Sequence, residues 1–122
     1  MSLDGIKALT FDTGGTILDW HTGFSTAFAE AGAKHGLEKD WGAVANDLRR
    51  KSLGRMLRLG KNEPPTYNFD DSHRMGVDDV CADYGLDAIT EAERRAIWWD
   101  RAHSLQCWPD FPETLPRLRE KF

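Results

Sequence analysis

The chain has 122 residues, of which 40% are hydrophobic, 11% aromatic and 30% charged. This length suits one domain, and the composition excludes a disordered chain. It also excludes a membrane protein, because no stretch approaches the roughly 20 consecutive apolar residues that a bilayer requires. The net charge of -4 excludes a general affinity for nucleic acid, so we expect a cytoplasmic protein with neither nucleic acid nor a membrane as partner.

The first predicted element is a strand over residues 6–11, which is mostly apolar and runs into a glycine-rich turn. This pattern is typical of a strand that is buried in a parallel sheet. Such a strand needs neighbouring strands to satisfy its backbone groups, and residues 65–69 are only a poor second candidate. We therefore expect that the chain is part of a longer protein or that the strand pairs with another chain.

The residues after Trp20 are predicted to be mostly helical, because apolar side chains recur there at helical spacing. The predicted helices cover residues 22–35, residues 41–59 after the cap Asp40, a stretch from Asp71 or Ser72 to 84, residues 91–105 after the cap Thr90, and the last residues to 122. Residues 90–93 match a capping box. Residues 61–65 are predicted to break the second helix, and 108–112 to form a loop. The cysteines at 81 and 107 are predicted to be reduced core thiols.

Asp12 directly follows the predicted strand and begins the sequence Asp12-Thr13-Gly14-Gly15-Thr16. A carboxylate at the carboxyl end of a buried strand stands where α/β proteins place their ligands. The two glycines let a substrate approach the backbone, and their N–H groups can form an anion-binding concavity. Thr16 lies four residues after Asp12 and can hydrogen-bond back to its carboxylate. An ordinary turn after a strand explains the spacing equally well.

Residues 8–20 resemble the first motif of the haloacid dehalogenase superfamily in the hydrophobic strand, the aspartate, the Gly-Thr pair and the following Leu-Asp. The next stretch resembles the helical cap inserted after that motif, and residues 108–115 resemble the return from cap to core. The resemblance implies an α/β fold, a Rossmannoid core with an inserted helical cap, of which this mostly α chain holds only the first strand and catalytic loop. The implied parts are 1–19 for that strand and loop, 20–107 for the cap and 108–122 for the return segment.

The resemblance implies a hydrolase whose nucleophile is Asp12. Its carboxylate attacks carbon or phosphorus, and water then hydrolyses the covalent ester or acyl phosphate. Thr16 and Arg49 are the other implied catalytic residues, because residues 48–53 resemble the cap segment in which dehalogenases place an arginine facing the active site. That arginine can pair with a substrate carboxylate or a departing halide. A solvated basic helix face is the alternative interpretation of Arg49.

The substrate-binding residues implied by the resemblance are Thr13, Gly14, Gly15 and Trp20, and Gly14 separates the branches of the family. Phosphatases of the superfamily usually place a general-acid aspartate there, L-2-haloacid dehalogenases a tyrosine and phosphonate-cleaving members an alanine. Glycine cannot donate a proton, and a halide needs none. Gly14 therefore argues against a standard phosphatase and allows a dehalogenase, but it is the usual residue of neither branch. The resemblance as a whole is closest to the type II L-2-haloacid dehalogenases, with a small 2-haloacid as the acidic substrate and no cofactor. The alternative is a Mg²⁺-dependent phosphatase or phosphonate hydrolase in which Asp12 and the Gly14 carbonyl bind the metal.

The other motifs of the family supply a serine or threonine, a lysine and further acidic or polar residues, and none of them can be placed in this chain. The residues of a catalytic unit act together. We therefore expect the 122-residue chain by itself to be inactive or nearly so. A non-catalytic, truncated binding module is the remaining alternative, and an unpaired strand predicts association into a homodimer or a larger assembly.

Overall fold

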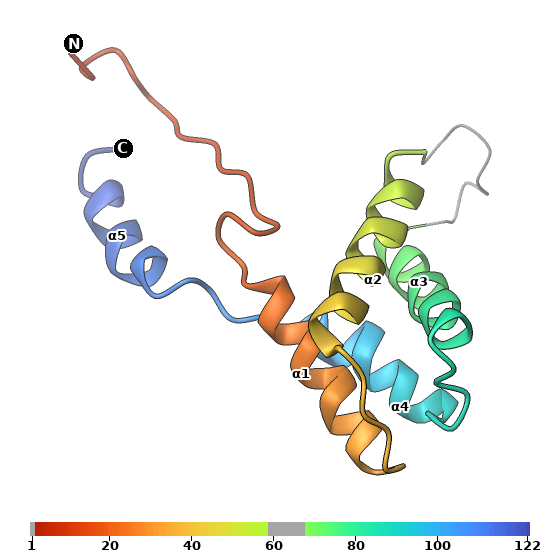
Figure 1. The fold of residues 1–122 in the computed structure, drawn as a ribbon. Coiled ribbons are helices and arrows are strands. Elements are labelled where there is room, and N and C mark those ends of the chain that lie inside the picture. The colour runs from red at the N-terminus through yellow and green to blue at the C-terminus, as the bar shows by residue number, and fades with distance from the viewer. Residues whose placement is uncertain (1, 59–67) are drawn as a thin grey trace.

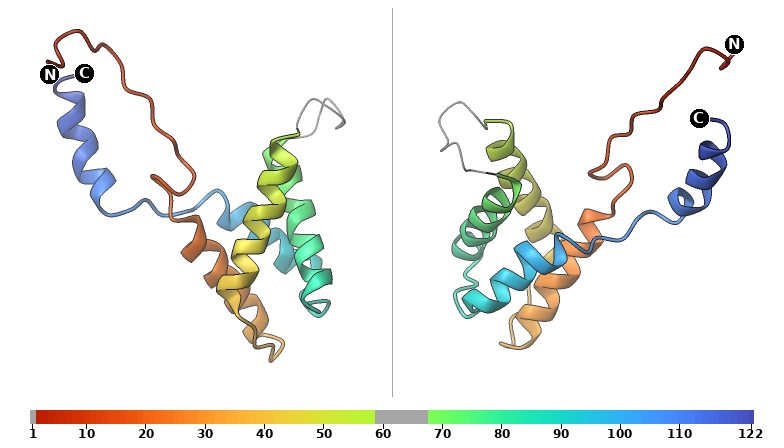
Figure 2. Two further views of the ribbon diagram at one scale, coloured as in Figure 1. Left: turned by 45° about the horizontal axis from the view of Figure 1, so that its top comes forward. Right: turned by 180° about the vertical axis from the view of Figure 1, so that it is seen from behind.

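A computed structural model describes residues 2–58 and 68–122. The described residues are mostly helical, and a π-helical segment, η1, continues α4. The elements are α1 (Trp20–Ala33), α2 (Trp41–Met56), α3 (Phe69–Asp83), α4 (Glu91–Arg95), η1 (Ala96–Arg101) and α5 (Asp110–Arg119). Helices α1 to α4 and η1 form one bundle, whereas the N-terminal segment and α5 extend away from it and bring the two ends of the chain near each other (Figures 1 and 2).

One apolar core lies between α1, α2, α3 and η1. Its large side chains are fully buried, and those of α1, α2 and α3 follow the expected helical spacing. They are Phe24, Phe28, Val44, Leu48, Val77, Val80, Cys81, Leu86, Ile89 and Ile97. The core thus belongs to the bundle alone, since α5 contributes no buried residue.

Side chains cap the helices at the positions where they begin. The Asp40 carboxylate accepts the Ala43 N–H at 2.9 Å, and Thr90 forms a capping box with Glu93, so both predicted caps are confirmed. Helix α1 begins at Trp20 rather than Thr22 because Asp19 caps it. Helix α3 begins at Phe69 rather than Asp71 or Ser72 because Asn68 caps it.

The predicted strand over residues 6–11 is wrong in this structure. The described residues contain no strand, only isolated bridges from Leu18 to Gly14 and to Cys107. Phe11 is 46% exposed, and its ring meets the edge of Phe111 from the α5 segment at a centroid distance of 5.9 Å. A parallel strand forms only against neighbours that take up its backbone hydrogen bonds, and no described segment lies alongside to do so.

Other expectations about the elements also need correction. The predicted loop at 108–112 is largely helical, because α5 begins at Asp110, and the fourth helix ends at Arg101 instead of 105. Residues 65–67 of the weak strand candidate at 65–69 lie outside the described residues, and so do residue 59 and the predicted break at 61–65. Asn68 is the cap of α3, and Phe69 is its first residue. Both cysteines are free, but only Cys81 is buried, and Cys107 is exposed. Among the described residues, no helix is both long and apolar enough for a membrane crossing.

Candidate functional site

The Asp12 loop is held by short hydrogen bonds within residues 12–18. The Thr16 hydroxyl donates to the Asp12 carboxylate, with 2.6 Å between Oγ1 and Oδ2. The backbone N–H groups of Ile17 and Leu18 both donate to the Thr13 carbonyl, at 3.0 and 3.1 Å. Asp12 is exposed, and its other carboxylate oxygen, Oδ1, accepts none of the hydrogen bonds described within the loop. The hydrogen bond from Thr16 therefore fixes the direction of an exposed carboxylate.

Gly15 has the backbone conformation that a turn of this kind requires. Its φ of +96° lies in the region that favours glycine. Its N–H donates to the Leu18 carbonyl at 3.1 Å, so this donor is already used and does not contribute to the expected anion-binding concavity. A Cβ at this position would lie 3.1 Å from Nε1 of Trp20, the first residue of α1. Trp20 therefore packs directly against the loop.

Arg49 reaches the same loop from α2. A Cβ on Gly14 would lie 2.6 Å from Nη2 of Arg49, and the guanidinium carbon lies 5.5 Å from the centre of the Trp20 ring. Its basic neighbours have other partners, since Arg50 pairs with Asp47 and Lys51 with Asp83. The side chain of Arg49 is thus directed at the Asp12 loop and does not belong to a solvated helix face.

Trp108 is a site residue that the sequence analysis missed. Its indole Nε1 donates to the Gly15 carbonyl at 2.8 Å, and its backbone N–H donates to the Ile17 carbonyl, also at 2.8 Å. The contact spans 93 positions of the sequence. No local pattern could indicate it.

His73 of α3 lies in the surroundings of Arg49. Its ring packs near Phe24 with a centroid distance of 5.6 Å. Burial lowers the pKa of His73, and the positive charge of Arg49 lowers it further, while Asp70 opposes these effects. Burial and the charge of Arg49 therefore both favour the neutral form of the His73 imidazole.

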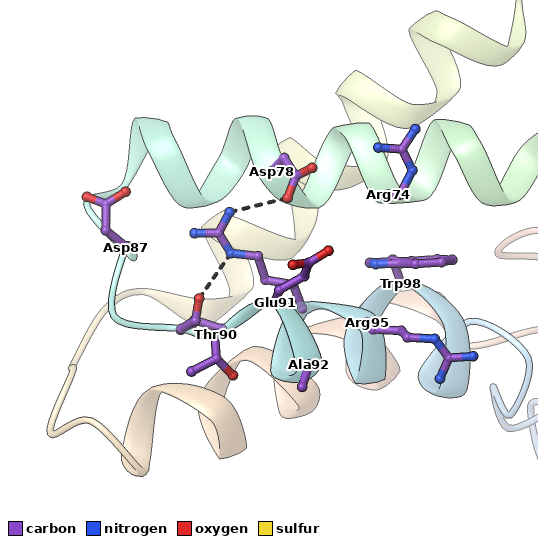
Figure 3. A pocket seen from close by; sticks show the side chains of 10 residues that line it. Arg74, Asp78, Asp87, Thr90, Glu91, Ala92, Arg95 and Trp98 are labelled. Carbon is purple, nitrogen blue, oxygen red and sulfur yellow. Dashed lines mark hydrogen bonds and ion pairs between the residues drawn. The ribbon is translucent and has the colours of Figure 1, made fainter.

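A separate cavity of about 730 Å³ lies between α3 and α4 (Figure 3). It is lined by Trp98 and by charged side chains that include Asp78, Glu91 and Arg94. Arg94 pairs with Asp78 at 3.2 Å and donates to the Ile89 carbonyl at 3.1 Å. None of the predicted site residues lines this cavity, so it is not part of the Asp12 site.

No protein-family model and no curated protein matches the sequence. Among solved structures, the crystal structure of the defluorinating L-2-haloacid dehalogenase Rha0230 matches with a TM-score of 0.73 and 33% sequence identity over 82% of this chain. The chain thus resembles the haloacid dehalogenase superfamily both in sequence and in fold. It spans 41% of the length of that structure. The mostly helical described residues match the helical cap region of that solved dehalogenase.

The groups around the Asp12 loop fit Mg²⁺ poorly. Mg²⁺ takes six oxygen ligands in octahedral geometry. Within residues 2–58 and 68–122, no group of three His, Cys, Asp or Glu side chains could hold a metal ion. The predicted metal ligands are the Asp12 carboxylate and the Gly14 carbonyl, and the Arg49 guanidinium already brings a positive charge to Gly14. A cation there would meet repulsion from Arg49.

Proposed function

We propose that this chain carries the nucleophile and the substrate-binding arginine of a hydrolytic L-2-haloacid dehalogenase. The observation that carries the proposal is the placement of the Arg49 guanidinium against Gly14, two residues from Asp12. This placement puts a cation on the loop that carries a potential nucleophile, as a substrate with a carboxylate next to its reacting carbon requires. Residues 1–19 would supply the catalytic loop to an α/β core, residues 20–107 the cap and residues 108–122 the return segment.

The proposed reaction has two steps. The Asp12 carboxylate attacks C2 of the haloacid opposite the halogen, forming a C–O bond while the halide leaves with the electron pair of the C–halogen bond. Water then attacks the carbonyl carbon of the Asp12 ester and releases a 2-hydroxy acid, and the water protons end on the product hydroxyl and in solvent. Because Thr16 occupies Oδ2, Oδ1 is the oxygen left to attack.

The other site residues have complementary roles in this proposal. Arg49 pairs with the substrate carboxylate or stabilises the departing halide, and Trp20 holds the guanidinium by stacking. The backbone at Thr13 and Gly14 lies close to the substrate. The reaction needs no cofactor, since a halide leaves without protonation. The cytoplasmic location and the homodimer remain predictions.

Halide release from 2-chloropropionate and 2-fluoropropionate tests the proposal. The protein is assayed in the length in which its host makes it, beside an Asp12→Asn variant that keeps the size of the side chain but is a poor nucleophile. We expect halide release that Asp12→Asn abolishes. Single turnover in ¹⁸O-labelled water should place one labelled oxygen in Asp12, because water attacks the ester at the enzyme carbonyl.

The same assay separates the alternatives. Phosphate release from p-nitrophenyl phosphate with Mg²⁺, without any halide release, would replace the proposal by a phosphatase. If no substrate is turned over and no ¹⁸O label enters Asp12, the remaining alternative is a non-catalytic binding module.

Arg49 has a matched control in its neighbour Arg50, which is exposed and paired with Asp47. Arg49→Lys keeps the charge but loses the planar fork, and we expect kcat/KM to fall about 10- to 100-fold. Arg50→Lys should leave kcat/KM unchanged. Equal effects of the two variants would contradict the role of Arg49.

A further inference from the structure

Trp108 lies where two distant segments of the chain cross. Besides its indole bond to Gly15, the crossing has backbone hydrogen bonds from Trp108 N–H to the Ile17 carbonyl and from Asp19 N–H to the Gln106 carbonyl, at 2.8 and 2.9 Å. These two backbone hydrogen bonds join residues 17–19 to residues 106–108 without any help from the indole. The indole bond is therefore not needed to hold the segments together, and it acts on a different part of the loop.

The indole bond acts on the peptide unit between Gly15 and Thr16. Because a peptide unit is planar, fixing the Gly15 carbonyl also fixes the direction of the Thr16 N–H and the path of the chain into Thr16. Gly15 has no Cβ to restrict its backbone, so this unit is free to rotate unless another group restrains it. The Trp108 indole supplies that restraint from outside the loop.

We propose that Trp108 is a positioning residue for the nucleophile, because its indole N–H holds the Gly15–Thr16 peptide in the orientation from which the Thr16 hydroxyl aims Asp12. This inference rests on the proposed dehalogenase function. Displacement at a carbon needs the attacking oxygen in line with the leaving group, so a small rotation of the carboxylate lowers the rate. Trp108 itself need not touch the substrate.

Trp108→Phe tests the proposal, because it keeps a flat aromatic ring and both backbone bonds but removes the indole donor. We expect kcat with 2-chloropropionate to fall about tenfold while KM stays within about twofold, since only orientation changes. Trp99→Phe is the matched control. Trp99 is 38% exposed against 39% for Trp108, and its ring meets Trp98, His103 and Arg95 instead of the Asp12 loop. The kcat of Trp99→Phe should therefore equal that of the wild type.

A double-mutant cycle with Thr16→Val separates positioning from a purely structural role. If Trp108 acts through Thr16, Trp108→Phe should lower kcat by less than about twofold once the Thr16 hydroxyl is gone. A full tenfold fall in the Thr16→Val background would overturn the proposal. So would an unchanged kcat for Trp108→Phe alone.

A readout without turnover distinguishes this inference from the proposed function. In ¹⁵N-labelled protein, Trp108→Phe should shift the amide signals of Gly15 and Thr16 and leave those of α3 in place. If the wild type releases no halide but these signals shift, the dehalogenase proposal fails and the restraint by Trp108 stands. If the loop signals do not shift, the positioning role is overturned whatever the activity.

Discussion

The guanidinium of Arg49 occupies the space in which a side chain at position 14 would begin. A Cβ built on Gly14 lies 2.6 Å from Nη2 and 3.4 Å from Cζ of Arg49, whereas nonbonded carbon and nitrogen atoms normally stay more than 3.4 Å apart. In this structure, a side chain at residue 14 and the Arg49 guanidinium therefore cannot occupy their places at the same time. The two residues form one unit although 35 positions separate them.

Gly14→Ala should displace Arg49 without unfolding the protein. The atom in the way is the end of a flexible side chain, so the free energy of unfolding should change by less than about 1 kcal/mol. Because the guanidinium must leave the loop, we expect the KM for a 2-haloacid to rise about tenfold. Steady-state halide release and urea unfolding measure the two effects.

The control for Gly14→Ala is Gly54→Ala on α2, where an added Cβ meets no atom within 4 Å. That variant should keep KM and gain about 0.5–1 kcal/mol from helix propensity. An unchanged KM in Gly14→Ala would contradict the pairing of Arg49 with the substrate carboxylate.

Gly76 allows α2 and α3 to approach closely, and Gly76→Ala should destabilise the bundle. The new Cβ would lie 2.5 Å from Oγ of Ser52 and 3.0 Å from Cδ1 of Leu48, and both of these residues are fully buried. We expect a loss of about 1–3 kcal/mol in the free energy of unfolding, measured in urea. Adding Ser52→Ala removes the closest atom and should recover part of that loss. A neutral Gly76→Ala would mean that the helices can separate at little cost.

Glu93 should make the protein sensitive to acid. Its carboxylate accepts hydrogen bonds from His35 Nε2 at 2.7 Å and from the Thr90 N–H at 2.9 Å. The His35 bond first, and then the Thr90 bonds, lower the pKa of Glu93 from 4.5 to about 2. Because the folded pKa lies below the unfolded one, this stabilisation is complete above about pH 4.5 and is lost as the pH falls towards 2.

Thermal melts between pH 6 and pH 2 test the role of Glu93. The melting temperature of the wild type should fall more steeply below pH 4.5 than that of Glu93→Gln, which has no carboxylate to protonate. Glu91→Gln, in the same first turn of α4, is the control and should follow the wild type. Parallel curves for wild type and Glu93→Gln would refute the coupling.

The two cysteines should differ in reactivity towards a thiol reagent. Cys81 is fully buried, and this burial raises the pKa of its thiol to about 11, whereas Cys107 is exposed. Since the thiolate is the reactive form, one thiol per chain should react with DTNB rapidly at pH 8. The rapid reaction should disappear in Cys107→Ser and persist in Cys81→Ser, and the second thiol should react only in denaturant. Two rapid thiols would contradict the burial of Cys81.

Features that depend on neighbouring residues could be predicted from the sequence. The caps at Asp40 and Thr90 are local, because a side chain there meets backbone N–H groups two or three positions along the same turn. The same holds for the hydrogen bond from Thr16 to Asp12, which closes over four residues. The caps at Asp19 and Asn68 belong to this class too, and their residue types could have indicated the true starts of α1 and α3.

The sequence by itself determined the helical character of the bundle, most of its apolar faces and the residue types of the Asp12 loop, because each follows from local spacing. Only the tertiary structure decided that residues 6–11 form no strand, since pairing depends on what lies beside a segment in space. Only the packing of α1 and α2 placed Arg49 against Gly14, and only the crossing of two distant segments brought the Trp108 indole to Gly15. Such contacts form between residues far apart in the chain, where spacing along the sequence carries no information about distance.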